Sequence, residues 1–355
     1  MTTAAATAGA ELVEATLAAD GGRTREALLD HLHRNGLRGE LFDLVADYPL
    51  RPGKGIRPAL CLATCRACGG DDEDALPAAV AIELLHNAFL VHDDICDDAR
   101  LRRGSEALHV RHGVPRALSA GDALAWAALG PLLEHAARLR QRLAFDLLAE
   151  FDHLARRTIE GHALELHWRE RGLAGLDVDG YLRLVLDKTC WYSAIHPCRI
   201  GALLGSGGRA DLDPISRFGF FVGAVLQIRD DVENLTDRSE SNGKDFGSDI
   251  VEGKPTLMLI HLLSSSPPRT RDEALRLVGP VGDDSGLPRG ERIDRVVELM
   301  ENHGSIDHAC AFADGIAGAA LAELSPTITG LPESEDTAFL RSLVLHLRDP
   351  AIRGR

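Results

Sequence analysis

Apolar residues recur at intervals of three and four along most of the chain, and this spacing predicts amphipathic helices. Alternating runs rich in Val, Ile and Thr, which would predict strands, are scarce. Turns such as Gly69-Gly70 and Gly207-Gly208 separate the helical stretches. The predicted helices span 9–35, 56–68, 74–98, 116–136, 141–170, 178–206 and 213–236, with a short helix from Pro255 and further helices starting near Glu291, Ser305 and Glu333.

The order of these segments predicts one all-α domain, built as a helical bundle over residues 11–355. Neither an interdomain linker nor a fixed-period repeat interrupts it. Residues 1–10 are small and polar, and we expect a disordered tail there. The segment Ser264–Arg289 is rich in Ser, Pro, Gly and Asp, and we expect a mobile surface loop.

Composition narrows the classes of function. A chain of 355 residues with 45% hydrophobic content can bury a large core. Its net charge of −15 argues against nucleic acid as a partner, because phosphate backbones are bound by basic surfaces. No apolar stretch of 18 or more residues predicts a membrane span, and the N-terminus does not resemble a secretory signal. Seven cysteines, mostly in apolar surroundings, predict a reducing cytoplasm and a role as core fillers.

Two aspartate clusters carry the candidate chemistry. The first reads Asp93-Asp94-Ile95-Cys96-Asp97, and the second reads Asp230-Asp231-Val232-Glu233-Asn234. Residues four apart share a helix face, and like charges placed so repel one another. Each cluster follows an apolar stretch, so each helix should pack in the interior with its carboxylates at one end. Mg²⁺ prefers such oxygen ligands, and two facing clusters would suit a metal-bound diphosphate ester.

Positively charged residues occur in separate groups that fit two diphosphates. Arginine offers a planar fork for phosphate, whereas lysine offers a point charge. The candidates are Lys54, Arg57, Arg102, Arg103, Lys188, Lys244 and Lys254. For any single lysine, a solvated surface charge is the simpler alternative.

The ordered motifs of the chain resemble those of the trans-isoprenyl diphosphate synthases, from about Pro49 to Leu347. The motifs are Gly53-Lys54-x-x-Arg57-Pro58, Glu83-Leu84-Leu85-His86, Asp93-Asp94-x-x-Asp97, Arg102-Arg103-Gly104 with His109, Gly121-Asp122, Lys188-Thr189, Gln227-Ile228-x-Asp230-Asp231, Gly243-Lys244, Gly247-x-Asp249, Gly253-Lys254-x-Thr256 and Gly304-Ser305-Ile306. The resemblance implies an isoprenoid-synthase type of helical bundle with a central cavity, and a homodimer.

The resemblance also implies roles for individual residues. It implies that Mg²⁺ on the allylic diphosphate is ligated by Asp93, Asp97 and Asp230, with Asp94 and Asp231 in support. The same diphosphate would be held by Arg102, Lys188, Lys244 and Lys254. Isopentenyl diphosphate would be bound by Lys54, Arg57, His86 and Arg103. Thr189 and Gln227 would stabilise the allylic cation that the alkene attacks.

Three positions depart from the commonest pattern of the family. Asn234 stands where a third aspartate is usual, Gly55 replaces a frequent arginine, and His162 follows Gly161 where glutamine is usual. Asparagine keeps a carbonyl oxygen but loses a charge, so weaker metal binding is expected. The motifs Pro52-Gly53-Lys54-x-x-Arg57 and Asp230-Asp231-x-x-Asn234-Leu235 resemble those of geranylgeranyl diphosphate synthases of the eukaryotic type.

The residues before the first cluster bear on product length. Phe89 lies one turn before Asp93, about 6 Å along the helix axis, and could close the floor of a short cavity. The neighbouring Ala88 is small where short-chain members carry a bulky group. We therefore expect a twenty-carbon product, with a fifteen-carbon or a longer product as alternatives. Ordinary core packing is the other interpretation of Phe89.

Two other classes of function compete with chain elongation by isopentenyl transfer. A class I terpene cyclase also ionises an allylic diphosphate with Mg²⁺, but it needs no isopentenyl site. A non-catalytic regulatory subunit does not need both aspartate clusters. Apolar stretches such as Ala117–Leu133 would suit pairing with a second copy of the chain.

Overall fold

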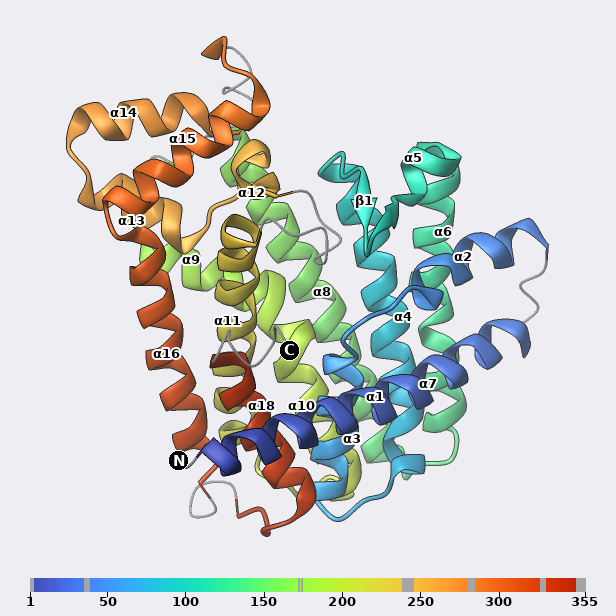
Figure 1. Ribbon diagram of the computed structural model, residues 1–355. Coiled ribbons are helices and arrows are strands. Elements are labelled where there is room, and N and C mark those ends of the chain that lie inside the picture. The colour runs from blue at the N-terminus through green and yellow to red at the C-terminus, as the bar shows by residue number, and fades with distance from the viewer. Residues whose placement is uncertain are drawn as a thin grey trace.

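The computed structural model describes residues 3–34, 39–171, 173, 175–237, 246–279, 285–325 and 330–348. Within these residues the chain is helical apart from one short antiparallel hairpin, which confirms the all-α fold class (Figure 1). The first elements are α1 (Thr3–Arg34), α2 (Glu40–Leu50), α3 (Ile56–Ala67), α4 (Asp72–Cys96), β1 (Leu101–Arg102), β2 (Ser105–Glu106), α5 (Leu108–His112), α6 (Val114–Ala127), α7 (Leu129–Ala136) and α8 (Gln141–Arg171). The later elements are α9 (Val178–Val185), the π-helix η1 (Leu186–Ile195), α10 (His196–Gly205), α11 (Leu212–Thr236), α12 (Ser248–Glu252), α13 (Leu257–Ser265), α14 (Pro268–Leu277), α15 (Arg289–Asn302), α16 (Ser305–Glu323) and α18 (Glu335–Arg348).

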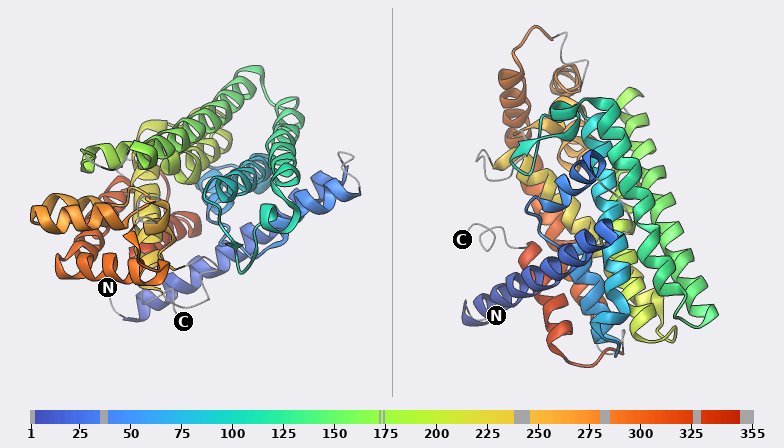
Figure 2. Two further views of the ribbon diagram at one scale, coloured as in Figure 1. Left: turned by 90° about the horizontal axis from the view of Figure 1, so that it is seen from above. Right: turned by 90° about the vertical axis from the view of Figure 1, so that its right-hand side faces the viewer.

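Helices α4 and α11, which carry the two aspartate clusters, lie inside the bundle. Helix α4 packs between α3 and α6, whereas α11 packs against α16 and η1. Seen from above, α8 runs along one side of the molecule and α1 crosses the opposite side (Figure 2). Both core helices end at the side of the bundle where the hairpin and α12 lie (Figure 1).

Helix α4 begins where the sequence provides a strong N-cap. The Asp71 side chain accepts hydrogen bonds from the backbone N–H groups of Glu73 and Asp74, and the Asp74 side chain accepts one from Asp71 N in return. The helix then buries an apolar run that includes Leu84, and it ends at Cys96. By length and composition α4 could cross a membrane, but 67% of its most apolar window is buried inside the protein, as in a soluble core helix.

The stretch predicted as one helix over 178–206 is divided by the π-helix η1. In a π-helix each backbone hydrogen bond spans one residue more than in an α-helix. Glycines on both sides allow neighbouring helices to approach it. A Cβ atom at Gly161 of α8 would lie 2.2 Å from Lys188 N, and one at Gly223 of α11 would lie 2.7 Å from Cys190 Cα. Any side chain at these positions would push η1 away, so the two glycines fix the place of Lys188 and Thr189.

Two expectations from the sequence are wrong in detail, and one helix was not expected. The expected loop over 264–289 contains helix α14, which begins with Pro268 in its first turn and buries Ala274 and Leu277 at helical spacing. Helix α1 begins at Thr3, inside the expected tail. Helix α2 was not expected, although Leu44, Val45 and Tyr48 are buried at helical spacing. Short amphipathic segments rich in Pro or charge give a weak periodic signal.

Candidate active site

Asp93 lies on the last turn of α4 and contacts two other elements. Its Oδ1 atom lies 2.8 Å from His162 Nδ1 on α8 and 3.9 Å from Lys188 Nζ on η1. Lys188 also donates to Glu165 Oε1 at 2.7 Å. Burial opposes ionisation of Asp93, but Lys188 and His162 hold the pKa of its carboxyl well below the ordinary value. Asp93 is therefore an ionised carboxylate at neutral pH, next to a lysine.

Asp97 caps the C-terminus of α4 and forms ion pairs with two cations. Arg169 of α8 donates to Oδ1 at 2.6 Å, and Lys254 Nζ lies 2.9 Å from Oδ2. Lys254 lies in addition 3.5 Å from Asp249 and 2.5 Å from Glu252. Burial raises the pKa of Glu252 to about 7, although Lys254 lowers it. Lys254 thus joins the end of α4 to the segment around α12.

Asp94 points away from this group of ion pairs. Its buried carboxylate accepts hydrogen bonds from the Tyr48 hydroxyl and from the Arg102 guanidinium, with Arg102 Nε at 2.8 Å. Arg51 holds the hairpin in place by donating to the carbonyl oxygens of Arg102 and Glu106, each at 2.8 Å. Asp94 therefore positions Arg102 and the hairpin, and Arg102 does not join Lys188 and Lys254 in this structure.

The second cluster, on α11, places its two aspartates in different surroundings. Asp231 is buried, and accepts hydrogen bonds from Gln227 Nε2 at 2.7 Å and from the Tyr181 hydroxyl at 3.2 Å. Burial and the nearby Asp249 raise the pKa of Asp231 well above its ordinary value. Asp230, one residue earlier, is exposed. Asp230 is therefore the aspartate that a solvent-borne metal can reach, while Asp231 anchors Gln227.

Thr189 and Gln227, both predicted to face the allylic cation, lie in direct contact. The Thr189 hydroxyl donates to Gln227 Oε1 at 2.6 Å, and Asp231 accepts from the other end of the same amide. Two hydrogen bonds thus fix the orientation of the Gln227 amide. Asn234, one turn after Asp230, donates to Ser248 Oγ at 3.0 Å and accepts from Asp249 N at 3.3 Å. Asn234 therefore ties the segment around α12 to α11.

Residues from three elements meet at the predicted isopentenyl side. Arg57 of α3 donates to the Tyr192 hydroxyl at 2.7 Å and to Ser193 Oγ at 2.8 Å. Its guanidinium also lies 4.4 Å from the centre of the Tyr192 ring, and its NH1 lies 3.3 Å from His86 Nε2. Burial and the neighbouring arginines lower the pKa of His86 well below its ordinary value, so the ring is neutral.

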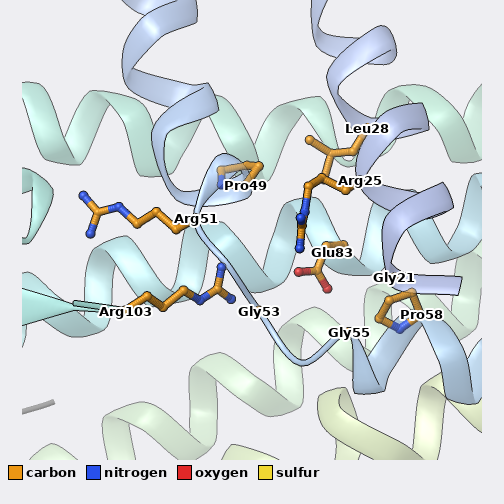
Figure 3. Close-up of a pocket in the computed structure, with 10 residues that line it drawn as sticks. All are labelled: Gly21, Arg25, Leu28, Pro49, Arg51, Gly53, Gly55, Pro58, Glu83 and Arg103. Carbon is orange, nitrogen blue, oxygen red and sulfur yellow. The ribbon is translucent and has the colours of Figure 1, made fainter. Parts of the chain in front are cut away.

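Beside this group lies a pocket between α1, the end of α2, the loop before α3, and α4 (Figure 3). Arg103 points into it past Gly53, while Arg25 of α1 and Glu83 of α4 point toward one another. Burial, together with the nearby guanidinium groups, lowers the pKa of Arg103. An anion in this space would relieve that repulsion.

The loop before α3 explains one departure from the family pattern. Gly55 has a φ of +64°, and a Cβ atom there would lie 3.0 Å from Gly21 Cα on α1. Glycine is thus required by the left-handed conformation and by the close helix, and an arginine at this position would be strained. Lys54, next to it, extends toward the end of α11, with Nζ 3.8 Å from Glu233 Oε2.

The residues predicted to limit product length lie on the buried face of α4. Ala88 is fully buried. Phe89 is partly buried and meets the Tyr192 ring edge to face, with centroids 5.9 Å apart. The two rings come from α4 and η1, so an aromatic pair lies one turn from Asp93.

One predicted contact is not seen, and one predicted residue is not described. Among the described residues, no three His, Cys, Asp or Glu side chains lie close enough together to hold a metal ion. The sharing of an ion by Asp93, Asp97 and Asp230 thus stays a prediction. Lys244 lies outside the described residues.

Reasoning from the sequence missed two residues that contact the aspartates. Glu165 pairs with Lys188, and Arg169 pairs with Asp97. With His162 they occupy positions 162, 165 and 169 of α8, which share one face of a helix. This spacing of polar residues was the signal that could have identified them. Tyr48 and Tyr181 gave no comparable signal, because their partners lie about 50 residues away in the sequence.

Comparisons with known proteins agree with this geometry. A family profile described as polyprenyl synthetase matches residues 40–286. The chain is similar to a short chain isoprenyl diphosphate synthase of Methanothermobacter thermautotrophicus, with 33% identity over 82% of this chain and 84% of the relative. A geranylgeranyl diphosphate synthase of Saccharolobus solfataricus is 31% identical over 81% and 82% of the two chains.

The fold is similar to the crystal structure of a geranylgeranyl pyrophosphate synthetase from Pyrococcus horikoshii. The TM-score is 0.82 at 28% identity, over 96% of this chain and 98% of the other. The family profile covers more than half of the chain, and together with these relatives it shows that the chain belongs to the polyprenyl synthetase family.

Proposed function

We propose that the chain is a prenyltransferase that joins isopentenyl diphosphate head-to-tail to an allylic diphosphate. The allylic substrates are dimethylallyl, geranyl and farnesyl diphosphate, and the product is an all-trans short-chain prenyl diphosphate, geranylgeranyl diphosphate. The names of the relatives and the family membership support this reaction. The observation that carries the proposal is the pairing of the acidic end of α4 with lysines from η1 and the α12 segment.

These ion pairs fit the binding of a metal diphosphate. Hard oxygen ligands on Asp93, Asp97 and Asp230 suit Mg²⁺, and the ion pair of Asp97 with Lys254 Nζ at 2.9 Å supports an ionised carboxylate there. When bound, Mg²⁺ would neutralise the diphosphate and make it a leaving group. Lys188 and Lys254 are placed to bind the same diphosphate, since both lie against the carboxylates that would hold the metal.

The chain's own residues would bind and orient the two substrates. Arg57, Arg103, His86 and Lys54 would bind the isopentenyl diphosphate. Arg103 lines the pocket, Arg57 and His86 lie beside it, and the exposed Lys54 would have to turn toward it from Glu233. The fixed oxygens of Thr189 and Gln227 would face the allylic cation and stabilise its charge. The buried walls around Phe89 and Tyr192 would exclude water from this cation, which water would otherwise capture.

The twenty-carbon product is part of the proposal. Phe89 and Tyr192 would together limit the depth of the cavity, whereas the small Ala88 leaves room beside them. We expect Phe89→Ala to lengthen the product, as measured by chromatography of the dephosphorylated prenols. An unchanged product would show that Phe89 is an ordinary core residue.

We also propose a cytoplasmic homodimer without a membrane span. Large apolar side chains are exposed on the adjacent helices α6, α7 and α8, and a second copy would cover them. They are Leu118, Trp126, Leu133, Phe145 and Ile159. Trp126 is the most exposed of them, at 74%.

Incubation of the pure protein with Mg²⁺, isopentenyl diphosphate and each allylic primer tests the function. We expect consumption of isopentenyl diphosphate and formation of linear prenyl diphosphates up to twenty carbons. A cyclic hydrocarbon formed without isopentenyl consumption would favour a terpene cyclase. Failure to turn over any primer would favour a non-catalytic subunit. Either result would overturn the proposal.

A further inference from the structure

His162 brings an imidazole to the carboxylate that the proposed function assigns to the metal. It lies on α8, directly after Gly161, where the absence of a side chain lets the helix approach Lys188 of η1 closely. Its Nδ1 atom lies 2.8 Å from Asp93 Oδ1. Both side chains keep about a quarter of their surface exposed, 24% for His162 and 26% for Asp93, so an ion can reach them from solvent.

The separation of these two atoms matches two neighbouring ligands of one ion. In an octahedral site with bonds near 2.1 Å, adjacent ligand atoms lie about 3 Å apart. The pair Asp93 Oδ1 and His162 Nδ1 can thus form one edge of an octahedron with little movement of either side chain. Water and diphosphate oxygens would complete the coordination.

The surroundings leave the imidazole available as a ligand. Its Nε2 atom is buried and has no hydrogen-bond partner among the described residues, so no second contact commits the ring to one tautomer. Lys188 lies 3.9 Å from Asp93, but Glu165 pairs with Lys188 at 2.7 Å.

We propose that Asp93 and His162 form a mixed oxygen and nitrogen site that binds the transition-metal ions Mn²⁺ and Co²⁺ more tightly than Mg²⁺. Imidazole nitrogen is a good ligand for first-row transition metals, whereas Mg²⁺ prefers oxygen. The inference rests on the proposed function for the role of Asp93. The inference goes beyond the proposed function because it assigns a metal preference to His162, which stands where the family pattern usually has glutamine.

Metal binding to the substrate-free protein tests this site without any measurement of turnover. Isothermal titration with CoCl₂ and with MgCl₂ gives both affinities, and the absorption bands of bound Co²⁺ report nitrogen coordination. His162→Gln keeps an N–H that can still hold Asp93 but removes the imidazole. We expect this variant to lose at least about tenfold in Co²⁺ affinity, with Mg²⁺ affinity changed by less than about twofold.

His167→Gln is the matched control, because it removes an exposed imidazole five residues further along the same helix. It should leave both affinities unchanged, and thermal unfolding should confirm that both variants are folded. Equal losses for Co²⁺ and Mg²⁺ in His162→Gln would show that His162 only positions Asp93, and would overturn the proposal. No loss for Co²⁺ would overturn it as well. If Co²⁺ binds as expected but no primer is elongated, the proposed function fails while this metal site remains.

Discussion

The two ends of helix α4 carry similar acidic residues in opposite electrostatic settings. At the N-terminus, Asp71, Asp72 and Asp74 face the positive end of the helix dipole, and Asp71 and Asp74 form the capping box. At the C-terminus, Asp93, Asp94 and Asp97 face the negative end, where carboxylates are unfavourable. Acidic residues at a helix N-terminus need no further explanation. At a C-terminus they need cations to offset them, and this difference identifies the functional end.

The cations at the two ends also differ in arrangement. At the N-terminal end, Arg66 binds Asp20, Asp72 and Asp336, and so ties α1, α4 and α18 to α3. At the C-terminal end, Lys188 and Lys254 come from later segments, and they lie beside Asp93, whose side chain is 26% exposed, and Asp97, whose side chain is 5% exposed. The first arrangement holds helices together, whereas the second can exchange its partners for a metal and a diphosphate.

The largest expected effect is on catalysis at the C-terminal end. Asp93→Ala should lower kcat by about two to three orders of magnitude, because a group that stabilises developing charge is lost. The free energy of unfolding should fall only modestly, because the carboxylate is unfavourable at the helix C-terminus but its pairing with Lys188 and His162, which lowers its pKa, is lost with it. Steady-state turnover and urea unfolding measure the two quantities. A strong loss of stability would mean that Asp93 is a structural residue like Asp72.

The second effect is on stability at the other end. Arg66→Ala should lower the free energy of unfolding by about 2 kcal/mol, below the value for a fully buried pair because the Arg66 side chain is 24% exposed. The control is Arg295→Ala. Arg295 makes ion pairs of similar length with Glu273 and Glu298 in a more exposed place, and its loss should cost less than about 1 kcal/mol. Similar costs for both variants would contradict the structural role of Arg66.

A smaller loss is expected from the N-cap of α4. Asp71→Ala removes the acceptor for two backbone N–H groups and should cost about 1 kcal/mol. Asp71→Asn keeps the acceptor and should cost less. Turnover should be unchanged in both variants. Urea unfolding and the prenyl transfer assay measure these outcomes. A fall in turnover without a loss of stability would contradict the assignment of a purely structural role to the N-terminal end of α4.

A further effect, on the pH dependence of stability, is expected at Glu252. Its pKa is raised from 4.5 to about 7, so the folded protein keeps a proton that the unfolded chain has released. Stability should therefore fall as pH rises from about 4.5 to about 7. The free energy of unfolding of Glu252→Gln should lack this decrease. The difference in stability between the variant and the unmodified protein should therefore grow in favour of the variant as pH rises from about 4.5 to about 7. Thermal unfolding at several pH values measures it, and parallel pH curves would contradict the assignment.

The sequence predicted the helices that carry the acidic clusters well, because helix formation depends mainly on residues that are neighbours in the chain. The bounds of α4 and α11 follow from local spacing and capping residues, whereas the hydrogen bond between Thr189 and Gln227 joins residues 38 apart and was not predicted. The partners of Asp97 did not follow, since Arg169 lies 72 residues away and is brought there by packing. The π-helix was also missed, because it depends on the approach of α8 and α11 at Gly161 and Gly223.

Asn234 shows the limit of reasoning from a motif. Its place in the second cluster suggested a weakened metal ligand, whereas its side chain binds Ser248 and the backbone of Asp249. The same carbonyl oxygen serves a different partner, because the segment around α12 folds back on α11. Only the tertiary contact distinguishes the two roles.

The central claim is that Asp93 and Asp230 act on one metal-bound diphosphate. The direct measurement is a double-mutant cycle on the Mg²⁺-dependent binding of a non-ionising thiolo analogue of farnesyl diphosphate. If the two aspartates share one ion cluster, Asp93→Ala and Asp230→Ala should each abolish most of the binding, and the double variant should lose little more. Independent, additive losses would show that the two aspartates do not hold the same ligand, and would contradict the account.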